Sequence, residues 1–180
     1  SLDGGTGDDT LQFTTTAAGD YTVAAATLAG LSNVETIDID DGNNDGDANF
    51  DITINDDVVG AQVNTGQTFT VSRDATDSGT LTVDGSAVSS SYSLNLVGAQ
   101  GDDTLTGGAG DDTLDLDDGG KDSVTGGAGN DTFEVDGALA VGAVIDGGAG
   151  TADNITTDGN ADLSNTTISN VEVFNIGADN

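Results

Sequence analysis

The chain has 180 residues, of which 33 are acidic and two, Arg73 and Lys121, are basic, so its formal net charge at pH 7 is -31. This charge argues against binding to nucleic acid, and the absence of Cys and His excludes disulfides and thiolate or imidazole metal sites. No apolar run is long enough for a membrane-spanning helix, so we expect no membrane insertion. All the acids except Glu35, Glu134 and Glu172 are aspartates, which suit turns and hard metal ions.

The first segment, residues 1–44, opens with a glycine-aspartate nonapeptide at residues 4–12 (GGTGDDTLQ), whose sixth residue is Asp9. The apolar stretch 21–31 that follows predicts either a short helix or a loop. Residues 41–46 (DGNNDG) fit the opening of an EF-hand loop. The twelfth position of that loop is Ile rather than Glu and no flanking helices are evident, so an acidic turn is the preferred interpretation.

The second segment, residues 45–97, has the pattern of a strand-rich solenoid. Apolar and polar residues alternate over short stretches, which is typical of strands that are buried on one face. Clusters of Gly, Asp, Asn and Ser separate these stretches and predict turns. The predicted strands are residues 50–54, 68–71, 80–83 and 92–96.

The third segment, residues 98–134, repeats the pattern Gly-Gly-x-Gly-x-Asp-x-apolar-x. The apolar residues recur in phase and favour a core ladder over a flexible acidic linker. They are Leu105, Leu114, Val124 and Phe133. The copies are residues 98–106 (GAQGDDTLT), 107–115 (GGAGDDTLD), the degenerate 117–125 (DDGGKDSVT) and 126–134 (GGAGNDTFE).

The last segment, residues 135–180, contains another copy at 147–155 (GGAGTADNI), in which one extra residue places the aspartate at Asp153. This segment also repeats the beginning of the chain. We therefore predict a tandem unit of about 140 residues, of which this chain holds one unit and the start of the next. The matching pairs are residues 3–7 with 146–150, 143 residues on, and residues 31–39 with 168–176, 137 residues on.

Each nonapeptide combines a glycine-rich half that can reverse the chain with a three-residue strand that has one inward apolar side chain. Two nonapeptides would make one coil of a flattened helix, and the coils would stack at about 4.8 Å. Calcium takes six to eight oxygens, more than one turn supplies but within reach of two stacked turns. We therefore pair the turn 107–112 with 126–131, the turn 98–103 with 117–122, and the turn 126–131 with 147–153. The predicted fold class is all-β, a right-handed parallel β-roll or β-solenoid with calcium-bound glycine-aspartate turns.

The nonapeptides resemble the RTX (hemolysin-type) calcium-binding repeats, and the longer units look like those of bacterial surface-layer proteins and large RTX adhesins. The resemblance implies that the ligands are the sixth-position aspartates of both turns, together with carbonyl oxygens from each turn. One calcium ion would use Gly108, Gly110, Asp112, Gly126, Ala128 and Asp131. Another would use Ala99, Gly101, Asp103, Asp117, Gly119 and Asp122, although residues 117–122 lack the first two glycines. Further candidate ligands are Gly127, Gly129, Gly147, Ala149, Asp153 and Asp9.

We expect no enzyme activity, because His and Cys are absent, Lys121 lies in a turn and no acid pair stands out from the many carboxylates. The expected function is that of a secreted, cell-surface structural protein, a subunit of a surface layer, sheath or fibre. It would fold on binding several calcium ions and then self-associate into a lattice or filament. The alternatives are a stalk or binding segment of an RTX adhesin, with a cell-surface glycan as partner, and the calcium-folded secretion module of an exported hydrolase.

Overall fold

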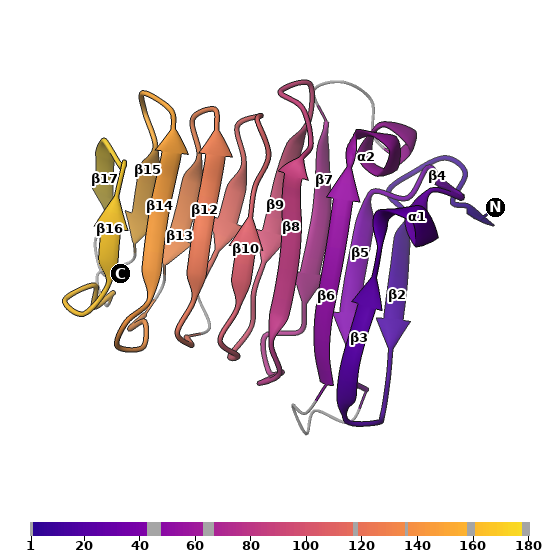
Figure 1. Cartoon of the computed structure of the whole chain (residues 1–180), viewed down its shortest axis with the longest axis horizontal. Helices are drawn as coiled ribbons and strands as arrows, with labels where there is room; N and C mark the ends of the chain where they lie inside the picture. The colour runs from indigo at the N-terminus through magenta and orange to yellow at the C-terminus, as the bar shows by residue number, and fades with distance from the viewer. Residues whose placement is uncertain are drawn as a thin grey trace.

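The computed structural model describes residues 2–42, 48–62, 67–116, 119–135, 137–157 and 161–177 (Figure 1). Strands dominate these ranges, and every pairing between named strands is parallel. The predicted all-β architecture with parallel strands is thus confirmed. No helix within the described ranges is long and apolar enough to cross a membrane.

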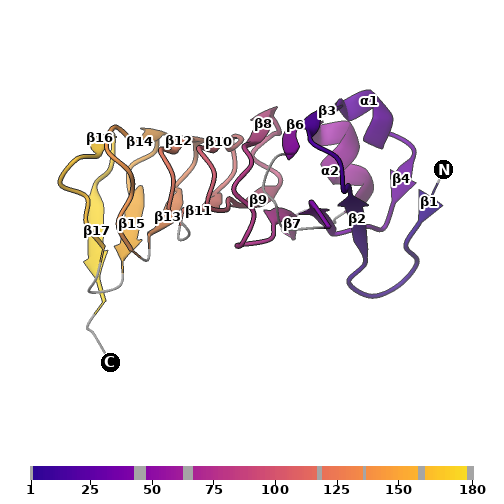
Figure 2. The ribbon, with the colours of Figure 1, turned by 90° about the horizontal axis from the view of Figure 1, so that it is seen from below.

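Two sheets run the length of the molecule and face each other, as Figure 2 shows. The seven-stranded sheet contains, in spatial order, β16 (Thr167–Ser169), β14 (Val144–Ala149), β12 (Ser123–Ala128), β10 (Thr104–Thr106), β8 (Leu81–Ala87), β6 (Ala48–Asn55) and β3 (Gly19–Val23). The eight-stranded sheet contains β17 (Val173–Ile176), β15 (Asn154–Thr157), β13 (Thr132–Val135), β11 (Thr113–Asp115), β9 (Ser93–Val97), β7 (Thr68–Arg73), β5 (Thr36–Asp40) and β2 (Thr10–Thr14). A separate pair joins β1 (Leu2–Asp3) to β4 (Leu31–Ser32).

From β5 onward, successive strands alternate between the two sheets, so neighbours within a sheet come from successive passes of the chain. The strands predicted within residues 45–97 are confirmed, as they correspond to β6, β7, β8 and β9, with β8 and β9 each beginning one residue later than predicted. The nonapeptide strands are confirmed as well, since β10 and β11 each consist of the three residues that follow a glycine-aspartate turn.

The core lies between the sheets, and each of the three-residue strands β10 and β11 contributes the apolar residue at its middle. Longer strands and both helices add further buried apolar residues. In the seven-stranded sheet, Leu105 pairs with Val124, and Val124 with Ile145. In the eight-stranded sheet, Leu114 pairs with Phe133. These side chains belong to a single buried cluster and are at most 1% exposed. The predicted core ladder is therefore confirmed.

The stretch 21–31, for which either a short helix or a loop was expected, contains a short helix in its middle, while its first residues belong to β3 and its last to β4. The structure places only α1 (Ala25–Leu28) in that stretch, between β3 and β4. A second helix, α2 (Asp56–Gln62), follows β6 and was not predicted. Its first turn carries two aspartates, which favours a helix N-terminus, and the N–H of Val58 donates to Oδ1 of Asn55 at 3.2 Å.

The acidic stretch at residues 41–46, considered above as an EF-hand opening, lies mostly outside the described residues. Of the two residues that are described, Asp41 is buried. Ile52, at the twelfth position, is a core residue in the middle of β6 rather than a residue of a loop. A strand at this point is incompatible with an EF-hand, whose twelfth residue lies at the end of a calcium loop.

Candidate metal centre

The glycine-aspartate turns stack on one another in the predicted pairs. The segment 107–112 lies against the segment 126–131, where the N–H of Ala128 donates to the carbonyl oxygen of Gly108 at 3.0 Å. This contact needs glycine, because a Cβ on Gly107 would clash with the carbonyl oxygen of Gly126. The segment 126–131 in turn lies against residues 147–153, with Gly127 in register with Gly148.

The sixth-position aspartates of these turns form a buried column. Oδ1 of Asp131 accepts the backbone N–H of Asp112 at 2.9 Å, and Oδ1 of Asp153 accepts that of Asp131 at 2.8 Å. At the start of the column, Oδ1 of Asp112 accepts the N–H of Leu94 at 2.7 Å. All three aspartates are at most 2% exposed. Each carboxylate therefore joins two successive passes of the chain.

A second, shorter column contains Asp103 and Asp122, which are also buried. Oδ1 of Asp103 accepts the N–H of Leu81 at 2.7 Å, and Oδ1 of Asp122 accepts the N–H of Asp103 at 3.0 Å. The degenerate turn therefore stacks on residues 98–103, although it lacks the usual first two glycines. Asp117, predicted as a ligand from this turn, lies outside the described residues.

Several of these carboxylates keep one buried oxygen without a hydrogen-bond partner among the described residues. Asp103 and Asp112 use both oxygens, because their Oδ2 atoms accept the N–H groups of Ala99 at 2.8 Å and Gly108 at 2.5 Å. A buried carboxylate oxygen without a partner is rare in folded proteins and fits a hard cation. The buried carboxylate oxygens without a partner are the Oδ2 atoms of Asp9, Asp122, Asp131 and Asp153.

Burial makes the charged form of these aspartates unfavourable. Burial raises the pKa of Asp103 and of Asp112 to about 6, although the backbone N–H groups that donate to these carboxylates act to lower it. It raises the pKa of Asp122 and of Asp131 to about 7, and there repulsion between carboxylates of successive turns adds to the effect of burial. A bound cation between the turns would offset both penalties and keep the carboxylates ionised at neutral pH.

The donor set matches calcium in chemistry, although no three acidic side chains in the described ranges converge on one point. Each pair of turns offers two carboxylates together with backbone carbonyl oxygens, all of them hard ligands. The carbonyl of Gly108, a predicted ligand, already accepts one N–H. A carbonyl oxygen has two lone pairs, so this hydrogen bond leaves it able to contact an ion.

The first glycine-aspartate turn, with Asp9, has a different partner. It lies against the segment Ser32–Glu35, where the N–H of Gly4 donates to the Ser32 carbonyl at 2.9 Å. The carboxylate of Glu35 accepts the N–H of Asp9 at 2.9 Å. At the far end of the long column, Glu172 does the same for Asp153 at 3.0 Å.

Glu35 and Glu172 were therefore missed as members of the site. The sequence held a signal for them, because two of its three glutamates recur in the matching segments 31–39 and 168–176. Asp77 was missed as well. It is fully buried, forms an ion pair with Arg73 at 3.3 Å and keeps Oδ1 without a partner in the described part of the chain.

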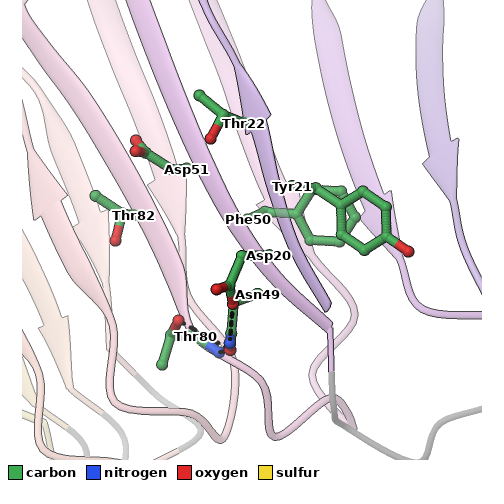
Figure 3. Close-up of a pocket in the computed structure, with 8 residues that line it drawn as sticks. All are labelled: Asp20, Tyr21, Thr22, Asn49, Phe50, Asp51, Thr80 and Thr82. Carbon is green, nitrogen blue, oxygen red and sulfur yellow. Dashed lines mark hydrogen bonds between the residues drawn. The ribbon is translucent and has the colours of Figure 1, made fainter. Parts of the chain in front are cut away.

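A shallow pocket of about 270 Å³ lies on the outer face of β3, β6 and β8 (Figure 3). Its polar groups bond to one another across the strands. Nδ2 of Asn49 donates to Asp20 at 2.8 Å, and Oδ1 of Asn49 accepts the N–H of Thr80 at 2.9 Å. We interpret this network as a link between neighbouring strands.

Comparisons of the chain with models of protein families, with curated proteins and with solved structures give no match. The relation to RTX repeats therefore remains a prediction from the nonapeptide motif. The function has to be inferred from the geometry of the stacked turns and from their charge.

Proposed function

We propose that the chain is a calcium-folded structural module of the RTX-repeat kind, built as a right-handed parallel β-roll or β-solenoid. The observation that carries this proposal is the long column of buried aspartates, in which Asp131 and Asp153 each keep a carboxylate oxygen without a partner among the described residues. Such a column is unfavourable unless protons or cations neutralise it. Calcium is the cation whose ligand preferences match two stacked turns.

In this proposal calcium ions lie between successive turns. Asp112 and Asp131 hold one ion, with carbonyls of Gly108, Gly110, Gly126 and Ala128. Asp103 and Asp122 hold another, with carbonyls of Ala99, Gly101, Asp117 and Gly119. Asp131 and Asp153 hold a third, with carbonyls of Gly127, Gly129, Gly147 and Ala149. Asp9 belongs to a corresponding site at the start of the chain. At every site the bound ion would neutralise the buried aspartates of the two turns.

Calcium binding would drive folding because the unfolded chain contains no preformed site, so the binding free energy becomes folding free energy. The net charge of -31 acts in the same direction, since self-repulsion opposes a compact state that lacks counter-cations. Extracellular calcium modules bind at about 10⁻⁴–10⁻³ M. The glycine-aspartate turns of such a chain would remain unfolded where calcium is scarce and fold once the chain is secreted.

The role that we assign to the folded module is a subunit of an extracellular surface layer, sheath or fibre. This role is supported by the recurrence, near residue 146, of the sequence and contacts found near residue 3, which suits tandem arrays. No catalytic role is assigned to any residue, because the buried acids of the described turns engage backbone groups of neighbouring turns.

A calcium titration followed by circular dichroism tests the proposal, starting from the chain in chelator. We expect the β-signal to increase with calcium. Magnesium at the same concentrations is the control and should have little effect, because it demands a smaller octahedral site and retains its water. A full β-signal in chelator that calcium leaves unchanged would refute calcium-driven folding.

A further inference from the structure

Two short segments outside the nonapeptides end in a glutamate that contacts a glycine-aspartate turn. They are residues 33–35 and 170–172, both with the sequence Asn-Val-Glu, and we call them the Asn-Val-Glu segments. The first lies against the turn that contains Asp9, and the second lies against the turn that contains Asp153. Each contact that they make has a counterpart between two stacked glycine-aspartate turns.

The first of these contacts is made by a carboxylate. Between two glycine-aspartate turns, Oδ1 of Asp131 accepts the backbone N–H of Asp112 at 2.9 Å. At the end of the same column, Oε2 of Glu172 accepts the backbone N–H of Asp153 at 3.0 Å. Glu172 therefore occupies the position that a sixth-position aspartate occupies in the next turn of the column.

The second contact is made by a backbone carbonyl oxygen. The carbonyl oxygen of Gly126, a predicted calcium ligand, lies so close to Gly107 that a Cβ on Gly107 would clash with it. The carbonyl oxygen of Asn170 lies against Gly147 in the same way. Asn170 thus presents its carbonyl oxygen where the second turn of a proposed calcium site presents that of its first residue.

The third contact leads into the following strand. The N–H of Thr132 donates to the carbonyl oxygen of Asp112 at 2.8 Å, and the N–H of Val173 donates to that of Asp153 at 2.9 Å. The segment 170–172 therefore enters its strand in the same register as a complete turn, although it is shorter. Its acid is glutamate, whose side chain is one methylene longer than that of aspartate and so suits the shorter path.

The N-terminal Asn-Val-Glu segment repeats all three contacts. Oε2 of Glu35 accepts the N–H of Asp9 at 2.9 Å. The N–H of Thr36 donates to the carbonyl oxygen of Asp9 at 3.2 Å. A Cβ on Gly4 would clash with the carbonyl oxygen of Asn33. The same arrangement therefore occurs twice in the molecule, once at each end of the stack.

The two asparagines are held in the conformation that brings their carbonyl oxygens to the turns. Asn33 and Asn170 both have φ of 53°, a left-handed value that is uncommon outside glycine but is tolerated by asparagine. Nδ2 of Asn33 donates to Oδ1 of Asp3 at 2.7 Å, and Nδ2 of Asn170 donates to Oδ1 of Asp146 at the same distance. Asparagine thus adds a side-chain hydrogen bond that glycine could not make.

The carboxylates at these contacts call for a positive charge. Asp153 is 0% exposed, and the buried Oδ2 atoms of Asp153 and Asp9 have no hydrogen-bond partner within the described ranges. A second carboxylate, that of the glutamate, lies next to each of them. The two basic residues of the chain are engaged elsewhere or exposed, since Arg73 pairs with Asp77 and Lys121 is exposed. A cation would offset the burial and the repulsion.

We propose that each Asn-Val-Glu segment is half of a further calcium site, in which it replaces the second glycine-aspartate turn. The glutamate supplies a carboxylate and the asparagine a backbone carbonyl oxygen, and the turn opposite supplies its sixth-position aspartate. This inference rests on the proposed function, because it takes the stacked turns 107–112 and 126–131 as the pattern of a calcium site. The ligands are Asp9, Asn33 and Glu35 in one site, and Asp153, Asn170 and Glu172 in the other.

Equilibrium dialysis of the full chain against calcium tests the inference, in about 0.15 M salt to screen loosely held counter-ions. Glu172→Gln keeps an oxygen that can accept the N–H of Asp153 but removes the negative charge. At a calcium concentration that just saturates the wild type, this variant should bind about one ion fewer per chain. Glu35→Gln should have the same effect at the other end of the stack.

Glu134→Gln is the matched control, because it makes the same change in charge at an exposed position on β13. It should bind as many calcium ions as the wild type. Circular dichroism in calcium verifies that each variant is folded, and the two Asn-Val-Glu segments provide independent tests if one variant fails to fold. If Glu35→Gln and Glu172→Gln bind calcium like the control, the glutamates serve only as N–H acceptors and the inference is overturned.

The wild-type chain separates this inference from the proposed function. A wild type that binds no calcium and gains no β-signal with it refutes the proposed function. A wild type that binds calcium and folds, while both Asn-Val-Glu variants keep its full number of ions, refutes only the two further sites. Calcium-driven folding through the aspartate columns would then stand.

Discussion

Two regions of the molecule bury carboxylates between stacked turns, and they differ in the source of positive charge. In the first region the positive charge is the guanidinium of Arg73, which is part of the chain. This guanidinium donates to the carbonyl of Ala48 at 2.8 Å and to that of Thr80 at 3.0 Å, and it pairs with Asp77 at 3.3 Å. These ligands, two carbonyls and a carboxylate, are of the kind that calcium also prefers.

In the aspartate columns beyond residue 98, the carboxylates accept only backbone N–H groups in the described part of the structure. We infer that the positive charge for these turns comes from solution. The comparison indicates that one backbone arrangement can be stabilised by a fixed guanidinium or by a bound ion. The region around Arg73 should therefore depend less on calcium than the turns from 98 to 153.

The largest expected effect comes from removing the fixed cation. Arg73→Met leaves Asp77 buried without a partner charge, and breaking a buried pair in this way costs about 3–5 kcal/mol of unfolding free energy. Denaturant unfolding in saturating calcium measures the loss. Calcium should not restore the lost stability, because Arg73 acts where no ion is proposed to bind.

The double variant Arg73→Met/Asp77→Asn is the control for charge. It removes both members of the pair and should recover part of the stability lost by Arg73→Met alone. If the double variant is no more stable than the single variant, the uncompensated charge of Asp77 is not the cause of the loss.

The next largest effect is expected from removing one buried charge in the long aspartate column. Asp131→Asn keeps an oxygen that can accept the N–H of Asp112 but removes a buried charge. We expect this variant to be more stable than the wild type in chelator and less stable in calcium. The loss in calcium should reach about 2.7 kcal/mol for each ion that no longer binds, when calcium is 100-fold above the dissociation constant of that site.

Asp111→Asn is the matched control, because Asp111 belongs to the same kind of turn but is exposed, and it accepts the N–H of Asn130 at 2.7 Å. Its stability should change little in either condition. Unfolding curves of both variants, recorded with and without calcium, check the prediction. A uniform change at Asp131 that is independent of calcium would argue for a purely structural role.

The pH dependence should also differ between calcium-free and calcium-bound chains. Burial raises the pKa of Asp122 and Asp131 to about 7, above the ordinary aspartate value of 3.8, so the folded state binds more protons than the unfolded state between these values. Without calcium, stability should therefore increase as the pH falls from about 7 towards 4. In saturating calcium the ion holds the carboxylates ionised, so the same acidification should weaken binding and lower stability.

The smallest effect concerns the other basic residue. Lys121 has an exposed side chain in a turn, so Lys121→Met should change the unfolding free energy by less than about 0.5 kcal/mol. Thermal unfolding in calcium measures it beside Arg73→Met. Equal losses from the two substitutions would mean that net charge, and not the position of Arg73, determines stability.

Much of the architecture could be predicted because the nonapeptide is a local signal. The strand at 104–106, the stacking of 107–112 on 126–131 and the core ladder all follow from its period. The Arg73 cluster could not be predicted, because its ligands Ala48 and Thr80 meet only in the folded stack and share no motif. The helix α2 was missed because its seven residues carry no long apolar period.

Region-resolved hydrogen exchange, with and without calcium, tests the central claim most directly. Calcium should slow the exchange of amides in the aspartate columns, such as those of Asp112 and Asp131, by far more than it slows the exchange of amides in β6 and β7. The opposite result, in which the amides of the aspartate columns are equally protected in chelator and in calcium, would contradict the account, because the stacked turns would then need no cation from solution.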